Sequence, residues 1–332
     1  MKPIYKVGLA APMALGLVCA MALGGCGASR QELASHINAQ IPIASIEASL
    51  PKGPIAPGKK SPLVVKLTQP DGTVLTTEGA GRGKVKWKDL EVTAEVVHIN
   101  DKGVLSLDKD PRISNGSKGK VRVSVPNHPG LETELEVPFR YDLKYAANFS
   151  GSNGMNGLDG RNGTDGTSGM MGSLDPNHPS AGGDGSNGSN GTDGDRGKDG
   201  GDAPNLDVYV ALHPGRPVLL EASVSAGGGP TFYLIDPHGG SLYVHADGGD
   251  GGRGGRGGRG GRGGSGGIGT PNGRSGSDGF SGQDGLRGSD GRGGTITVTY
   301  DPDVKPYLEA IQVSSRNGPK PVYRERAVGP LW

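Results

Sequence analysis

The stretch Gly248–Gly269 reads GGDGGRGGRGGRGGRGGSGGIG, with glycine at every third position and a second glycine series beside the first. Three further segments carry the same period of three: 151–172, 182–200 and 273–291. Glycine supplies 64 of the 332 residues and aromatic residues only 5%. A single large apolar core is therefore not expected, and any order in these segments has to come from backbone hydrogen bonds.

The glycine period invites comparison with collagen, but two features of the sequence argue against a triple helix. None of the four segments contains proline, which collagen uses to hold the chain extended. The segments are also similar in length, each about 60 Å at ~3.1 Å per residue, as neighbouring antiparallel rods require. We therefore favour an intrachain bundle of polyproline II helices over 149–202 and 248–294. A collagen-like trimeric stalk and a disordered glycine-rich linker remain alternatives.

A polyproline II helix has three residues per turn, so every third residue lies on one ridge. A ridge of glycines lets a neighbouring backbone approach closely. Because 248–269 has two such ridges, we expect it nearest the bundle centre, with its third ridge facing outward. The corresponding ridge of 182–200 is mostly acidic or amide, and we expect it to face solvent rather than bind calcium. This ridge consists of Asp184, Asn187, Asn190, Asp193, Arg196, Asp199 and Asp202.

This periodicity resembles the glycine-rich domain of Obg-family GTPases and the glycine-rich antifreeze protein of snow fleas. The resemblance covers about 90 residues, rests on the spacing, and implies a fold but no activity. Neither a GTPase motif nor the flat Thr/Ala face of an ice binder is present.

The rest of the mature chain has a β pattern. Residues 41–148 carry alternating runs separated by turns, best developed over 131–145, and predict an immunoglobulin-like β-sandwich or a barrel. The insert 203–247 predicts a small β-sheet. Residues 295–332 predict a strand and a short helix over Val304–Val313 with Asp303 as N-cap. The expected fold class is mainly β, with the sandwich followed by the glycine-rich bundle and its inserted sheet.

Residues 1–25 have the pattern of an export signal, with a positive start and a long apolar run. The segment ends Leu23-Gly24-Gly25-Cys26, which resembles the lipobox of bacterial lipoprotein precursors. The resemblance implies acylation of Cys26, cleavage before it, and a tether over 26–40. Gly27 stands where inner-membrane lipoproteins usually carry Asp, which implies the outer membrane in a Gram-negative source. An uncleaved anchor and an ordinary secretory signal are the alternatives.

The sequence contains no catalytic constellation. The seven histidines are scattered, and HExxH, GxSxG and Walker A motifs are absent. The only other cysteine, Cys19, lies in the signal, so the mature chain has neither an internal disulfide nor a thiolate metal cluster. Without Lys2 and Lys6 the chain has 33 basic and 34 acidic residues, which gives no general attraction to nucleic acid. We expect no enzyme activity, cofactor, metal site or intracellular nucleic-acid partner.

The most specific candidate for binding is a row of four arginines on the outward ridge of 248–269. Such a row could bind an envelope or matrix polyanion: a glycan, lipopolysaccharide or extracellular DNA. The alternative is that the row pairs with acidic ridges of neighbouring rods or of neighbouring molecules. The sequence thus predicts a non-enzymatic envelope lipoprotein with a structural or adhesive role. The arginines are Arg253, Arg256, Arg259 and Arg262.

Overall fold

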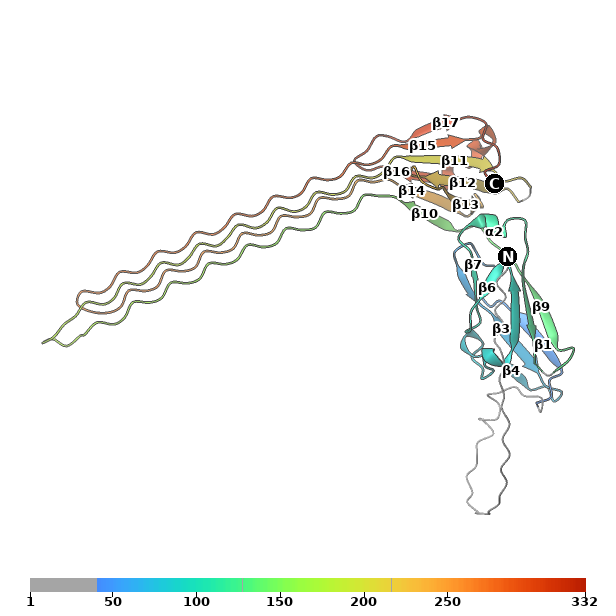
Figure 1. The fold of residues 1–332 in the computed structure, drawn as a ribbon, viewed down its shortest axis with the longest axis horizontal. Helices are drawn as coiled ribbons and strands as arrows, with labels where there is room; N and C mark the ends of the chain where they lie inside the picture. Colours follow the sequence, from blue (N-terminus) through green and yellow to red (C-terminus); the bar gives the residue numbers. More distant parts are fainter. Residues whose placement is uncertain (1–40, 127, 216) are drawn as a thin grey trace, which may run out of the picture.

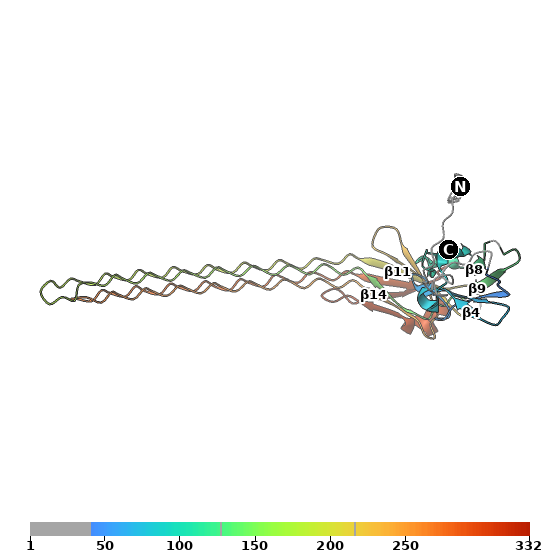
Figure 2. The same ribbon diagram turned by 90° about the horizontal axis from the view of Figure 1, so that it is seen from below.

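The computed structural model describes residues 41–126, 128–215 and 217–332. The chain is mainly β, as expected. Figure 1 shows an N-terminal group of strands, a second group of strands beside it, and a long shaft that projects from the second group. In the perpendicular view of Figure 2 the shaft again projects from the strands, whose two groups partly overlap there.

The N-terminal group contains three small antiparallel sheets, ordered β1-β3-β4, β2-β7-β6 and β5-β8-β9. They share one apolar core, because alternate residues such as Val121 and Val123 point inward while Arg122 stays exposed. Trp87 is 6% exposed within this core. The strands are β1 (Ser45–Ser49), β2 (Lys60–Pro62), β3 (Val64–Thr68), β4 (Val74–Thr76), β5 (Glu91–Glu95), β6 (Val97–Ile99), β7 (Val104–Leu107), β8 (Gly119–Ser124) and β9 (Glu132–Val137).

Three short helical turns connect these strands. They are the 3-10 helices η1 (Gly79–Gly81) and η2 (Trp87–Asp89), and the α-helix α2 (Pro111–Ser114). The side chain of Asp110 caps α2 by accepting a hydrogen bond from the backbone N–H of Arg112.

The long alternating run over 131–145 divides between the two groups of strands. Strand β9 ends before Pro138, which has no N–H to donate to a sheet. The next strand, β10 (Lys144–Asn148), pairs in parallel with β14 (Ser241–His245). Ala147 of β10 is buried in the second core. The range expected for the sandwich, 41–148, thus ends with a strand that packs elsewhere.

The second group contains two sheets packed around one apolar core. Their orders are β13-β12-β11-β15-β17 and β10-β14-β16. The remaining strands are β11 (Leu206–Leu212), β12 (Leu220–Ser225), β13 (Thr231–Ile235), β15 (Ile296–Tyr300), β16 (Ile311–Ser314) and β17 (Val322–Glu325).

The helix expected over Val304–Val313 is shorter and shifted. The structure has a 3-10 helix, η3 (Pro302–Ala310), capped by Asp301 rather than Asp303: the Asp301 side chain accepts from the backbone N–H of Asp303. Proline inside the helix removes a backbone donor, which disfavours a regular α-helix. From Ile311 the chain is a strand paired with β14, so the last residues of the expected helix were predicted wrongly.

The four glycine-rich segments form the shaft, and we call them rod 1 (151–172), rod 2 (182–200), rod 3 (248–269) and rod 4 (273–291). Rod 1 follows β10 and rod 3 follows β14; rods 2 and 4 lead back into β11 and β15 (Figure 1). The loop 173–181 joins rods 1 and 2 at the distal end, and residues 270–272 join rods 3 and 4. All four rods are therefore rooted in the second core.

The sheets also set the register of the rods. In the β10–β14 pair, Tyr145 lies opposite Leu242, an offset of 97 residues. The backbone N–H of Asp250 in rod 3 bonds the Asn153 side chain of rod 1 at the same separation of 97. The β11–β15 pair and rods 2 and 4 share a separation of 90 in the same way. The parallel strand pairs thus fix the residue register, and the rods keep that register along the shaft.

Candidate functional site: the shaft and its arginine row

Backbone hydrogen bonds join the rods once per glycine triplet. Gly157 N–H of rod 1 donates to the carbonyl of Arg253 at 2.7 Å. Gly255 N–H of rod 3 donates to Asp195 of rod 2 at 2.9 Å, and Gly285 of rod 4 donates to Gly255 at 2.7 Å. The same contacts repeat along each rod, so the shaft is held by a regular backbone lattice without an apolar core.

Rods 2 and 3 both occupy the middle of the shaft. Each forms backbone hydrogen bonds to the other three rods, whereas the described structure has none between rods 1 and 4. Rod 3 carries the buried glycines expected of a central segment, including Gly252, Gly255 and Gly258. Rod 2 shares this position although it has only one regular glycine ridge, which the sequence did not predict.

The glycines of both ridges of rod 3 stand against backbone atoms. A Cβ at Gly255 would overlap the carbonyl oxygen of Leu158 in rod 1, and one at Gly257 would overlap that of Gly282 in rod 4. Both contacts would be closer than the 3.0 Å that real Cβ atoms respect. Comparable overlaps with neighbouring backbone occur along all four rods. Side-chain-free ridges are therefore a requirement of the close approach between rods.

The acidic and amide ridges have a role that the sequence analysis missed. In rod 2 the Oδ1 atom of Asn190 accepts a hydrogen bond from the backbone N–H of Phe280 at 2.8 Å, and Asp193 accepts from Gln283 at 2.7 Å. These side chains remain exposed, but they are not merely solvated. They accept hydrogen bonds from backbone N–H groups that do not donate to a carbonyl of a neighbouring rod. Further members of the rod 2 series are Asp184, Asn187, Asp199 and Asp202.

Rods 1 and 4 repeat this arrangement toward rod 3. Asp159 of rod 1 accepts from the backbone N–H of Arg256 at 2.7 Å, and Asp284 of rod 4 accepts from Gly257 at 2.8 Å. The signal was available in the sequence as Asp or Asn two residues after glycine, in triplet after triplet. It was overlooked because a polar residue on a ridge is compatible with simple exposure.

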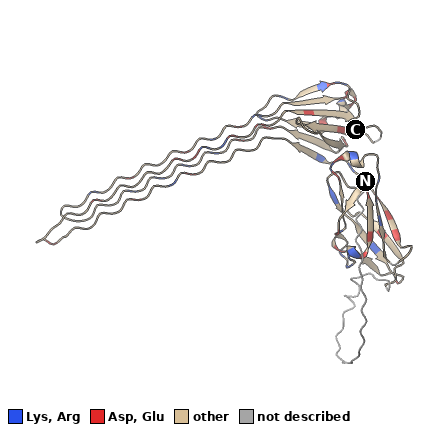
Figure 3. Ribbon diagram, viewed as in Figure 1, with Lys and Arg blue, Asp and Glu red and all other residues tan. Residues whose placement is uncertain are grey.

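The four arginines of rod 3 lie in one exposed row, as expected. Successive positions are three residues apart, or about 9 Å at ~3.1 Å per residue. Within the described residues none of the four guanidinium groups forms an ion pair, so the pairing alternative finds no support inside this chain. Figure 3 shows acidic and basic residues along the length of the shaft. The row is Arg253, Arg256, Arg259 and Arg262.

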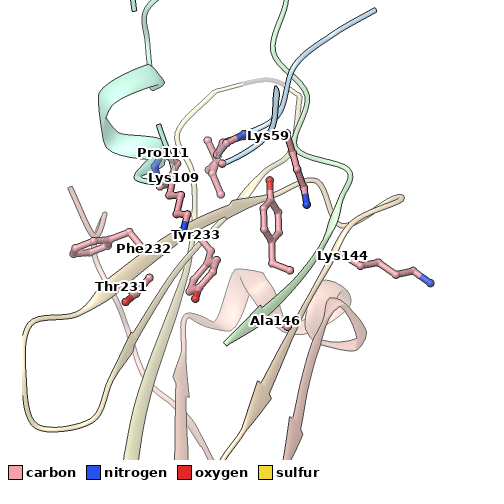
Figure 4. Close-up of a pocket in the computed structure, with 12 residues that line it drawn as sticks. Lys59, Lys109, Pro111, Lys144, Ala146, Thr231, Phe232 and Tyr233 are labelled. Carbon is pink, nitrogen blue, oxygen red and sulfur yellow. The ribbon is translucent and has the colours of Figure 1, made fainter. Parts of the chain in front are cut away.

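A cavity of about 530 Å³ lies where the N-terminal group of strands meets the second group. Lys59 and Lys109 come from the first group, and Lys144 and Tyr233 come from the second. In Figure 4 the Lys109 side chain runs toward Tyr233, whereas Lys144 points away from it. Burial raises the pKa of Tyr233, which stays a neutral hydroxyl at physiological pH. This cavity was not predicted from the sequence, because its lining comes from four separate segments.

The other candidate site, Cys26, lies outside the described residues, so its acylation stays a prediction. Among the residues that are described, no helix has the length and apolar character needed to cross a bilayer. In the same part of the chain, no cluster of three or more His, Cys, Asp or Glu side chains is arranged to hold a metal ion.

The chain has no match among protein-family models, curated proteins or solved structures. Functional inference therefore rests on the sequence and the geometry of the shaft.

Proposed function

We propose that this chain is a non-enzymatic, membrane-anchored surface lipoprotein with a structural or adhesive role in the cell envelope, and that the shaft is its rigid projecting part. The observation that carries the proposal is the backbone lattice, which joins four rods of one chain at every triplet. On this proposal Cys26 holds the molecule to the membrane, in an outer-membrane location, and no cofactor is involved.

We further propose that the rods are polyproline II helices and that the N-terminal strands form an immunoglobulin-like sandwich. The three-residue repeat divides each rod into three ridges. One is glycine, one faces outward, and the third is glycine in rod 3 but carries side chains in the other rods. This division is what three residues per turn would produce. Glycine N–H groups such as those of Gly157, Gly255 and Gly285 donate to other rods of the same chain, which supports an intrachain bundle over a trimeric collagen-like stalk.

The distal end of the shaft favours an adhesive role. Exposed apolar side chains also occur along rods 1 and 4, at Met155, Leu158, Phe280 and Leu286, but four lie together where rods 1 and 3 end. Their exposed fractions are 85% for Met170, 70% for Met171, 59% for Leu174 and 55% for Ile268. Gly172 N–H donates to the Ile268 carbonyl, which places these two rod ends side by side. Exposed apolar patches of this kind typically mark contact surfaces.

The anchor can be tested by changing Cys26 to Ser and, as a matched control, Cys19 to Ser. We expect acyl-chain labelling and membrane association to be lost only in Cys26→Ser, because a thiol at residue 26 is the acceptor. Surface location is measured in parallel by protease digestion of intact cells. Equal labelling of both variants, or a shaft that stays protected in intact cells, would contradict the proposal.

A second candidate function is binding of an envelope or matrix polyanion by the arginine row. The specific observation in its favour is that four exposed guanidinium groups stand in line without an ion-pair partner in the described structure. We expect binding to an anionic polymer to weaken with salt and to disappear when all four arginines are changed to Gln.

A further inference from the structure

The four arginines of the row do not have the same surroundings. Arg256 lies between two carboxylates, because its own N–H bonds Asp159 of rod 1 and the next N–H, that of Gly257, bonds Asp284 of rod 4. Arg262 repeats this arrangement: its N–H bonds Asp165 and the N–H of Gly263 bonds Asp278.

Arg253 and Arg259 have uncharged groups or a cation at the equivalent places. The N–H of Arg259 bonds Asn162, and the N–H of Gly260 bonds the Ser281 hydroxyl. The N–H of Arg253 bonds Asn156. On the rod 4 side, the triplet register places Arg287 opposite Gly254, and Arg287 pairs with Asp290 at 2.6 Å.

The face of rod 3 is therefore patterned rather than uniformly basic. Arg256 and Arg262 have a carboxylate on each side in their own triplet, and Arg253 and Arg259 do not. Asp250, one triplet before Arg253 on the same ridge, is paired with Arg316 at 3.1 Å. The uncompensated positions are six residues apart, or about 19 Å at ~3.1 Å per residue. The carboxylates beside the other two positions repel any further negative charge. Duplex DNA, with one charge per ~1.7 Å of axis, would place phosphates against those carboxylates.

From this pattern we propose that the row binds a linear acidic glycan of low charge density, with Arg253 and Arg259 as the anion-binding residues. This inference rests on the polyanion-binding function proposed above. Asn156 and Asn162 use Oδ1 to accept from rod 3, which leaves their amide N–H groups as donors beside the two arginines. A sugar polymer supplies hydroxyl acceptors between its charges, whereas a dense phosphate chain does not.

The flanking carboxylates exclude dense polyanions in this proposal. Changing them to Asn keeps the Oδ1 acceptor, as Asn156 and Asn162 already demonstrate in the same ladder. The variant Asp159→Asn/Asp165→Asn thus alters charge while leaving the hydrogen-bond lattice in place, and circular dichroism would verify its fold.

The test measures binding of the soluble chain, residues 27–332, to hyaluronan, which has one carboxylate per disaccharide, and to a DNA duplex at the same ionic strength. We expect Arg253→Gln/Arg259→Gln to lose roughly tenfold in hyaluronan affinity, as two exposed charge contacts allow. The matched control Arg274→Gln/Arg292→Gln removes the same charge from two exposed positions, one in rod 4 and one just after its end, and should bind like the parent. Asp159→Asn/Asp165→Asn should gain DNA binding severalfold.

The outcomes separate the two proposals. If changing all four arginines leaves binding to both polymers unaltered, the polyanion-binding function itself is wrong. If that fourfold variant loses binding, but the parent binds DNA as tightly as hyaluronan and the Asn variant gains nothing, only the charge-density inference is overturned. The charge-density inference is also overturned if Arg253→Gln/Arg259→Gln and the control Arg274→Gln/Arg292→Gln lose the same amount of hyaluronan affinity.

Discussion

The shaft and the second group of strands belong to one continuous structure, yet they are stabilised in different ways. The sheets bury large apolar side chains such as Leu220 and Ile235, neither of which is measurably exposed. The shaft buries mainly glycine. Its rods are joined by backbone hydrogen bonds and by bonds from backbone N–H groups to Asp and Asn side chains, which we call Asx bonds. One region depends on the presence of side chains and the other on their absence, so removing side-chain atoms should destabilise the sheets and adding them should destabilise the shaft.

The largest effect is expected from adding methyl groups inside the shaft. In Gly255→Ala/Gly258→Ala each Cβ would overlap a rod 1 carbonyl, so the rods must separate and lose several hydrogen bonds. At ~0.5–1.5 kcal/mol for each net bond, the loss amounts to several kcal/mol. The control Arg256→Ala/Arg259→Ala in the same rod should leave the fold intact. Thermal unfolding followed by circular dichroism measures both, and equal stability of the two variants would contradict the role assigned to bare ridges.

A smaller but wider effect is expected in the core from which the rods start. Leu220→Ala should destabilise the second group of strands by about 2–5 kcal/mol, the range for buried leucines. Because the sheets set the rod registers, the shaft should lose hydrogen-exchange protection along with the sheet. If the shaft amides stay protected from exchange under conditions in which the sheets have unfolded, the rods do not depend on this core.

Removing one Asx acceptor should cost less. Asn190→Ala leaves the Phe280 N–H without its 2.8 Å partner, and we expect a loss of about 1 kcal/mol. Asn190→Asp retains Oδ1 and should be close to the parent, while Phe280→Ala removes a side chain that is 79% exposed and should be neutral. Denaturant midpoints of the three variants give the comparison. Similar losses in all three would show that the acceptor is unimportant.

The smallest effect is a pH dependence confined to acid. The hydrogen bond from the backbone of Gly251, together with Arg287, holds the pKa of Asp290 below its ordinary value of 3.8. A carboxylate with a lowered pKa in the folded state stabilises it above the unfolded pKa, and this contribution disappears as the pH falls through the folded value. The melting temperature should thus be flat above about pH 5 and fall below about pH 4. In Asp290→Asn the melting temperature should fall less steeply with acid. An unchanged slope would show that other groups cause the decrease.

The sequence predicted the features that repeat locally. The glycine period identified the four rods and their turns, and it placed Arg253 and its neighbours on an exposed ridge. Alternation identified most strands, because each side chain is either buried or exposed within a few residues of its neighbours. The Asx ladders were also visible as a period, but their hydrogen-bond partners lie 90 or 97 residues away.

Long-range pairing explains what was missed. Whether Tyr145 belongs to the first core or the second depends on β14, almost a hundred residues later. The central position of rod 2 depends on the registers of two parallel strand pairs. The cavity around Lys109 and Tyr233 forms only when two groups of strands meet. None of these relations has a local period.

Hydrogen exchange at the rod 3 glycines is the most direct test of how the shaft is held together. The N–H groups of Gly252, Gly255 and Gly258 donate to rod 2 carbonyls at 2.8–2.9 Å. In the monomeric chain we expect these amides to exchange far more slowly than those of an unstructured peptide, and at a rate independent of protein concentration. Exchange at the unstructured rate, or protection that arises only as the chain associates into trimers, would contradict an intrachain lattice of glycine-edged rods.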